Sequence, residues 1–241
     1  MRQKLTGIVL RVVKWNERHK IINIYTTQNG LMGFLVPDSS TKSSRARNSM
    51  LMPLSVVEFE ANIRPGSDLA TLHDLQRRIP LIDIYSNPVK NAIVLFVSEL
   101  LCHCIQEHEQ NTALFKFIEE SIVRLEDSRD SVANFHLCFL YHLGKYLGIV
   151  PNVQTYRDGY WFDMQEGVFV ASRREGHSCL PPEEAKVLHN LSRISFQNMH
   201  LFHFNREQRN EVLALVLSYY RIHNSTIGSL NSPEVLSQLF V

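Results

Sequence analysis

The chain has 241 residues, of which 44% are hydrophobic and 20% are charged. This composition excludes an intrinsically disordered protein and predicts one large folded domain or two small ones. No run of about 20 apolar residues is present to span a membrane. The opening residues, Met1 to Lys4, lead into a strand pattern without an apolar signal segment, so we expect a cytoplasmic protein.

The formal net charge of +1 conceals a segregation of charge along the chain. Residues 1–79 contain 12 Lys and Arg against 6 Asp and Glu, a surplus of six positive charges, whereas residues 80–241 contain 13 against 18. A basic module of this kind suits a polyanionic partner, because Lys and Arg release the counterions that condense on phosphates. An ordinary solvated surface is the alternative interpretation.

Residues 1–79 alternate between runs of branched or aromatic residues and turn residues, a pattern that predicts a small β domain. The expected strands are 8–13, 21–25, 31–36, 54–60 and one that begins at 69–72. Asn29-Gly30 predicts a tight hairpin turn, because such turns require a positive φ. Residues 37–49 are polar and predict a mobile loop. Five short strands are typical of a closed barrel of the OB type.

The apolar spacing becomes helical from Asn87-Pro88, where Asn can cap a helix and Pro fits its first turn. The expected helices are 88–109, 112–127, 131–147, 182–195, 206–224 and 233–240. Residues 152–181 predict an irregular insert with short β elements near 160–162 and 168–170. The predicted class is therefore α+β, with an N-terminal five-stranded OB barrel at 1–79 and a mainly α-helical domain at 80–241.

None of the common catalytic motifs occurs in the sequence. A glycine-rich phosphate loop with Lys and Ser or Thr is absent, and so are the G-x-S-x-G and H-E-x-x-H motifs. The acidic residues Glu119, Glu120, Glu126 and Asp127 are interpreted as solvated charges on the outer face and end of a helix. The sequence therefore predicts a protein that is not an enzyme and that needs no cofactor.

Histidine and cysteine residues give only weak metal signals. His200 and His203 form the closest approach to a ligand pair, and Cys102 and Cys104 flank another histidine. Because no second pair stands at a suitable spacing, these imidazoles are interpreted as core-facing or helix-end groups. The four cysteines form no C-x-x-C pair, so neither a disulfide framework nor a zinc site is expected.

Basic residues flank the first expected strand and occur again within 37–49. In an OB-type barrel, nucleic acid crosses the central strands between the loops, so basic loops beside aromatic residues can follow a phosphate backbone. Trp15 is a candidate for stacking on bases, whereas Tyr25 and Phe34 fit the barrel core better. The candidate DNA-binding residues are Arg11, Lys14, Trp15, Arg18, Lys20, Lys42, Arg45 and Arg47.

Several short runs, taken in order, resemble the RecO family. They are Gly7 to Lys14, Glu17, Ile24 to Thr26, Gly30-Leu31, the basic stretch after the third strand, Met52 to Ser55, Ala133 to Leu137 and Leu143 to Pro151. The resemblance covers essentially the whole chain. Although no single run is as specific as a metal site, their order and the division into β and α parts make coincidence improbable.

The resemblance implies a DNA repair and recombination mediator that anneals complementary strands without ATP. It also implies that the protein helps to load RecA onto strands coated by single-strand-binding protein. The implied partners are single- and double-stranded DNA, RecR, the C-terminal tail of single-strand-binding protein and, indirectly, RecA at the bacterial nucleoid. DNA contact would fall on the cations named above. Arg129, Phe135 and Lys145 are candidates for contact with the tail.

One departure from the family concerns the insert at 152–181. Many relatives carry a zinc module of four cysteines there, whereas only Cys179 falls in this segment. The zinc module is therefore expected to be lost, and packing around Trp161, Phe162 and Phe169 should hold the insert instead.

An alternative from a different class is an interaction scaffold whose barrel binds an acidic protein. Salt distinguishes the two hypotheses. Contacts with several phosphates give single-strand binding a steep dependence on salt, whereas a scaffold would hardly bind DNA.

Overall fold

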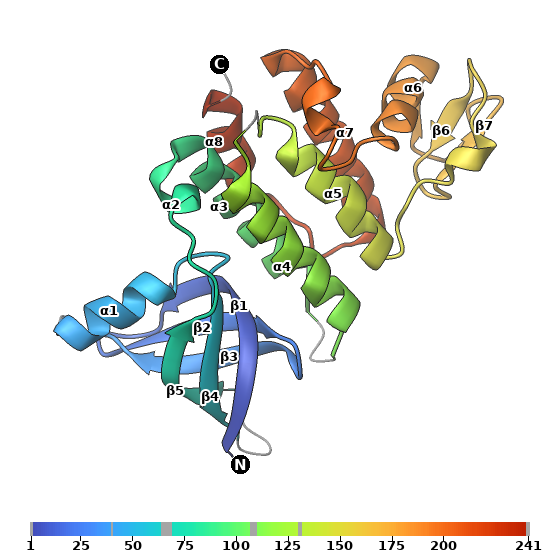
Figure 1. Cartoon of the computed structure of the whole chain (residues 1–241). Coiled ribbons are helices and arrows are strands. Elements are labelled where there is room, and N and C mark those ends of the chain that lie inside the picture. Colours follow the sequence, from blue (N-terminus) through green and yellow to red (C-terminus); the bar gives the residue numbers. More distant parts are fainter. Residues whose placement is uncertain (1, 40, 64–68, 107–109, 130–131, 240–241) are drawn as a thin grey trace. The chain divides into compact units, whose positions relative to one another are not determined.

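The computed structural model describes most of the chain, and Figure 1 shows its course. The residues that it describes are 2–39, 41–63, 69–106, 110–129 and 132–239. They fall into two compact units, Met1–Asp127 and Ser128–Val241.

The first unit contains a closed barrel of five strands, as the sequence predicts. Its strands are β1 (Arg2–Lys14), β2 (His19–Thr26), β3 (Gly30–Pro37), β4 (Val56–Asn62) and β5 (Leu69–Arg77). They close in the order β1-β2-β3-β5-β4, with β3 and β5 parallel and the other pairs antiparallel. Strand β1 is longer than expected because its first half pairs with β4 and its second half with β2.

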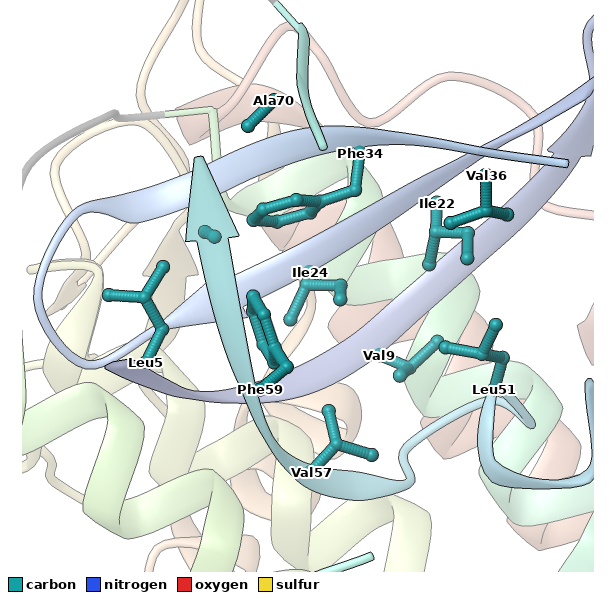
Figure 2. Packing of buried hydrophobic residues seen from close by; sticks show 11 residues of the cluster. Leu5, Val9, Ile22, Ile24, Phe34, Val36, Leu51, Val57, Phe59 and Ala70 are labelled. Carbon is teal, nitrogen blue, oxygen red and sulfur yellow. The ribbon is translucent and has the colours of Figure 1, made fainter. Parts of the chain in front are cut away.

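The barrel core is built from alternate residues of the strands, because successive side chains of a strand point to opposite faces. Figure 2 shows these side chains converging inside the barrel. Phe34 of β3 and Phe59 of β4 meet edge to face, with ring centroids 5.0 Å apart. The described members of this core are Leu5, Val9, Ile22, Ile24, Phe34, Val36, Leu51, Val57, Phe59, Ala61 and Ala70.

The predicted Asn-Gly hairpin joins β2 to β3. Gly30 has a φ of 63°, the left-handed conformation that this turn needs. The Oγ1 of Thr26 accepts a hydrogen bond from the backbone N–H of Asn29 at 3.1 Å and donates one to the Gly30 carbonyl oxygen at 2.9 Å. A local signal in the sequence thus fixes the register of this pair.

The prediction of a mobile loop at 37–49 is wrong, because Lys42–Met50 form helix α1, drawn beside the barrel in Figure 1. Thr41 caps the helix, and its Oγ1 accepts a hydrogen bond from the backbone N–H of Ser44 at 3.3 Å. The Ser44 side chain is buried. The spacing of apolar residues does not reveal this helix, because the helix has no apolar stripe. Its cap and its contacts with the barrel segments hold it instead.

The described residues of the first unit also form helices α2 (Asp83–Ser86), α3 (Pro88–Cys104) and α4 (Thr112–Asp127). The predicted cap of α3 is confirmed, since Asn87 Oδ1 accepts hydrogen bonds from the next backbone N–H groups. The helix is shorter than the expected 88–109, of which 107–109 lie outside the described residues. Ser98 of α3 donates a hydrogen bond to the Leu10 carbonyl oxygen, which ties the helix to β1.

The second unit is mainly helical and includes a small antiparallel sheet. Its helices are α5 (Phe135–Tyr146), α6 (Pro182–Leu191), α7 (Arg206–His223) and α8 (Ser232–Leu239), with 3-10 turns at Val153–Thr155 and Met199–Leu201. The sheet strands are β6 (Trp161–Asp163), β7 (Val168–Val170) and β8 (Cys179–Leu180), in the order β7-β6-β8. The two β elements expected in the insert are therefore confirmed as β6 and β7.

The helix ends of the second unit follow local signals where these exist. Asn205 and Gln208 form the expected capping box at the start of α7. Gly148, with a φ of 71°, follows α5. Helix α6 ends at Leu191, before the expected residue 195, because the next backbone N–H groups bond to carbonyl oxygens three residues earlier in place of four.

The domain boundaries predicted at 1–79 and 80–241 stay a prediction. The last barrel strand ends at Arg77 and helix α2 begins at Asp83, while the first compact unit continues to Asp127. In the part of the chain that the structure describes, every helix falls short of the length and apolar character that crossing a bilayer demands.

Replacing Gly7 of β1 by Ala is expected to lower the free energy of unfolding by about 2 kcal/mol, because overpacking a closed barrel forces side chains or backbone to move. A Cβ at Gly7 would overlap the Cγ2 of Ile24 and lie 3.3 Å from the Tyr25 carbonyl oxygen. Urea unfolding measures the change. Gly228→Ala is the control, since nothing lies within 4 Å of its added Cβ. Equal midpoints for the two variants would contradict the prediction.

Candidate nucleic-acid interface

The hairpin between β1 and β2 presents several of the predicted DNA-binding residues. The backbone N–H of Trp15 donates to the His19 carbonyl oxygen at 3.0 Å. Asn16 then closes the turn, because its Oδ1 accepts a hydrogen bond from the Arg18 backbone N–H at 2.8 Å. The tip of this hairpin is therefore a turn whose backbone is held by hydrogen bonds.

The hairpin tip meets the end of β3 and the start of the connection to α1. The backbone N–H of Asp38 donates to the Arg18 carbonyl oxygen at 2.7 Å, and the Asp38 carboxylate pairs with Lys20 at 2.9 Å. Arg47 of α1 donates to the carbonyl oxygen of Pro37, which also belongs to this junction. The structure therefore brings the hairpin cations and the α1 cations to one end of the barrel, although they are far apart in sequence.

The predicted cations differ in whether another group of the protein pairs with their charge. Lys20 is neutralised by Asp38, and Arg47 is half-buried, with hydrogen bonds to Pro37 and to the Ser44 Oγ at 3.2 Å. The other five are exposed and form no ion pair with any residue that the structure describes: Arg11, Lys14, Arg18, Lys42 and Arg45. Lys14, Arg18, Lys42 and Arg45, together with Trp15, define the cationic end of the barrel, whereas Arg11 lies farther back on β1, near Cys102 of α3.

Cations at the start of β1 are neutralised. Arg2 pairs with Glu60 and, at 2.6 Å, with Asp74, and Lys4 pairs with Glu58 at 3.2 Å. The surplus positive charge of the N-terminal module therefore does not spread evenly over the barrel. It gathers where β1 ends, on the hairpin and on α1.

Sequence reasoning missed Arg77 as a neighbour of this surface. Its guanidinium donates to the carbonyl oxygen of Ser49, in the last turn of α1, at 2.8 Å. The signal that would have found it is the full length of β5, which runs to Arg77, whereas the sequence reveals only its beginning at 69–72. Arg77 thus adds an exposed cation beside α1.

The three aromatic candidates differ in how far their side chains are exposed. Trp15 exposes 63% of its surface. Phe34 lies in the barrel core, as expected, whereas Tyr25 is buried outside that core, against Phe115 of α4 with ring centroids 6.0 Å apart. Of the three, Trp15 is the one that a ligand can reach directly.

The three candidates for contact with a partner's tail lie in the second unit. Arg129 and Lys145 are exposed, and Lys145 Nζ lies 5.7 Å from the centroid of the Tyr141 ring. Phe135 is buried and packs against Phe196, with ring centroids 5.1 Å apart. A partner could therefore contact the two cations directly, but not the Phe135 ring.

No group of three His, Cys, Asp or Glu side chains suited to a metal occurs among the described residues. Burial raises the pKa of Cys102 to about 11 and that of Cys104 to about 12, so both thiols stay protonated near neutral pH. His200 and His203 are exposed, so neither is core-facing, whereas His200 stands in the 3-10 turn Met199–Leu201, in line with the alternative of a helix-end group. Among the described residues, neither the two histidines nor the two cysteines have the further side chains that a metal site requires.

Packing in the insert centres on Phe162 and Phe169, as expected, whereas Trp161, the third residue predicted to hold it, is only half-buried. The two phenylalanine rings lie 4.8 Å apart. A buried carboxylate that sequence reasoning missed also organises the insert. Asp163, which is fully buried, accepts hydrogen bonds from His177 Nδ1 at 2.8 Å and from Arg174 at 3.0 Å. Its other oxygen accepts from two backbone N–H groups of the following turn. This network joins β6 to the loop before β8.

A closed five-stranded barrel with a cationic end, followed by helices, defines a class of OB-barrel proteins suited to polyanions. The family model "Recombination protein O N terminal" matches residues 1–77, and "Recombination protein O C terminal" matches residues 85–226. The chain therefore belongs to the RecO family of DNA repair proteins, and the resemblance seen in the sequence is confirmed.

Full-length relatives support the same family. The chain is 38% identical over 241 residues to the DNA repair protein RecO of Bacteroides fragilis, with 100% of both chains covered. It is 37% identical over 240 residues to that of Phocaeicola vulgatus, again with 100% of both covered. The identity to the protein of Porphyromonas gingivalis is 33% over 238 residues, with 97% of each chain covered.

Proposed function

We propose that this protein binds single-stranded DNA at the cationic end of its barrel and anneals complementary strands without ATP. The observation that carries the proposal is that the hairpin and the start of α1 meet through the Arg18–Asp38 and Arg47–Pro37 contacts. These two elements carry four exposed cations that form no ion pair with a described residue: Lys14, Arg18, Lys42 and Arg45. Lys and Arg at such a surface bind phosphates of any sequence, because phosphate contacts position a strand without reading its bases. The same contacts reduce the repulsion between two strands that must approach each other.

Membership of the RecO family supports a wider role as a recombination mediator. In this proposal the protein works with RecR at the nucleoid and helps to load RecA onto strands coated by single-strand-binding protein. The acidic tail of the latter protein would meet Arg129 and Lys145 of the second unit. The proposal assigns no catalytic step to any residue, since binding and release of strands are sufficient for annealing.

The test is the annealing of complementary oligonucleotides in the absence of ATP and added metal. The variant carries Lys14→Glu, Lys42→Glu and Arg45→Glu, and it leaves Arg47 in place because Arg47 supports the backbone beside α1. We expect rapid annealing by the wild type and loss of the acceleration in the variant. The plot of log affinity against log salt should also become less steep by about 2, at about 0.7 per phosphate contact on single strands.

The matched control carries the same change of charge on three exposed cations elsewhere: Lys116→Glu, Arg173→Glu and Arg206→Glu. It should anneal nearly as fast as the wild type. Equal impairment of both triple variants would contradict the placement of DNA on the cationic end. A wild type that anneals no faster than the protein-free reaction would contradict the proposed function and favour a scaffold that binds an acidic protein.

A further inference from the structure

Trp15 occupies an unusual position for a large apolar side chain. It stands at the tip of the β1–β2 hairpin with 63% of its surface exposed. Its backbone is held by the hydrogen bond to His19, and the turn is closed by Asn16. The indole is therefore presented from an ordered base, which lowers the entropy that is lost when a ligand binds to it.

The barrel gives no structural reason for an indole at this place. Its core is filled by other aromatic side chains, such as Phe34 and Phe59. The neighbours of Trp15 on the hairpin, Lys14 and Arg18, are exposed cations without an acidic partner among the described residues. A ligand that fits both features offers an apolar face and carries negative charge, and a nucleic-acid base joined to its phosphates combines the two.

We infer that Trp15 stacks on an unpaired base and so makes the cationic end select single-stranded over double-stranded DNA. This inference rests on the DNA binding proposed above and names the form of DNA that the site takes. In a duplex, the neighbouring base pairs cover both faces of each base. A single strand leaves faces free for an aromatic ring, and such stacking tolerates any sequence.

The inference separates two contributions to binding. The cations contact phosphates in both forms of DNA, and these contacts make affinity fall as salt rises. Stacking displaces no condensed counterions and is open only to unpaired bases. Trp15 therefore sets the ratio of single-strand to duplex affinity, while Lys14, Lys42 and Arg45 set the dependence on salt.

The experiment uses the two tryptophans of the chain, Trp15 and Trp161. In the Trp161→Phe variant, Trp15 is the sole indole and its fluorescence reports stacking. A single-stranded oligothymidine should quench this emission in parallel with binding measured by anisotropy of a labelled strand. A duplex of equal length should cause little quenching.

Substitution of Trp15 then measures selectivity. Trp15→Ala should bind the single strand about tenfold more weakly, with duplex affinity within about twofold of the wild type and an unchanged salt slope. Trp15→Phe should recover most of the single-strand affinity. Val12→Ala, which alters an exposed apolar side chain on the same strand, should change neither affinity.

Two results would overturn the inference while leaving the proposed function intact. One is single-strand binding without quenching and with unchanged affinity in Trp15→Ala. The other is an equal loss of single-strand and duplex affinity in that variant. Failure of the wild type to bind either form at low salt would instead contradict the proposed function itself.

Discussion

Asp163→Ala should lower the free energy of unfolding by about 3 kcal/mol, because it removes a buried acceptor from four partly buried donors, and an unsatisfied donor costs up to about 1–3 kcal/mol. The carboxylate is fully buried at the end of β6. One oxygen accepts from the backbone N–H groups of Gln165 and Glu166, both at 3.1 Å. The other accepts from Arg174 and His177, so the variant leaves all four donors without their acceptor.

The stabilisation by Asp163 should depend on pH. Burial raises the pKa of this carboxyl, but the hydrogen bonds from Glu166, His177 and Gln165 outweigh it and hold the pKa below its ordinary value of 3.8. A carboxyl whose pKa is lower in the folded state stabilises fully above its unfolded pKa and loses this effect as the pH falls through the folded pKa. The difference between wild type and Asp163→Ala should therefore be constant near neutral pH and shrink below about pH 4.

Urea unfolding in a Trp15→Phe background measures this effect, because Trp161 of β6 is then the sole tryptophan and its fluorescence reports the second unit. Asp163→Asn keeps one acceptor oxygen and should fall between wild type and Ala. Asp158→Ala is the control, since that carboxylate is exposed and forms a single ion pair, with Lys186 at 3.4 Å. A loss no greater than that of the control would contradict the structural role of Asp163.

Glu126→Ala should lower the free energy of unfolding by about 2 kcal/mol, because its carboxylate satisfies the first N–H groups of α2. Oε1 accepts from Ile82 N–H and Asp83 N–H, both at 2.8 Å, and Oε2 accepts from Ile84 N–H at 2.9 Å. A negative charge at a helix N-terminus is also favoured by the helix dipole. Because Glu126 is only half-buried, water replaces part of what is lost.

The loss of Glu126 should also loosen the contact between α2 and α4. Buried Lys90 joins the same region, since its Nζ donates to Asp83 at 2.5 Å and to the Glu126 carbonyl oxygen at 2.9 Å. Hydrogen exchange should therefore show faster exchange of the Ile82, Asp83 and Ile84 amides in Glu126→Ala. Glu120→Ala, on the exposed face of α4, should change stability by less than about 0.5 kcal/mol. Unaltered exchange at the α2 amides would show that the carboxylate does not hold this helix.

Glu126 also marks a limit of sequence reasoning. From the sequence it was interpreted, with Glu119, as a solvated helix charge, and that interpretation is wrong for both. Glu119 pairs with Arg78 at 3.4 Å. Glu126 accepts hydrogen bonds from the first N–H groups of α2, more than 40 residues earlier in the chain. Both contacts join segments that are distant in sequence, so they cannot be predicted from a local pattern of charge.

Local patterns by themselves determined the class of this protein. Alternation of apolar residues produces the barrel strands, because side chains of a strand alternate between core and solvent. Apolar residues at helical spacing, with a cap such as Asn87 or Asn205, produce the helices of the second half. The order of these local signals also carried the likeness to the RecO family.

Only the tertiary structure decided the existence of α1 and the composition of the candidate DNA site. Helix α1 has too few apolar residues for its spacing to reveal it, and its position depends on contacts such as that between Arg47 and Pro37. The same junction brings Arg18 next to Asp38 and so places the hairpin cations beside those of α1. The sequence gives only the total charge, and pairing in space decides which cations are neutralised. Arg2, Lys4 and Lys20 are paired with acids of neighbouring segments, while Lys14, Arg18, Lys42 and Arg45 form no ion pair with any described residue.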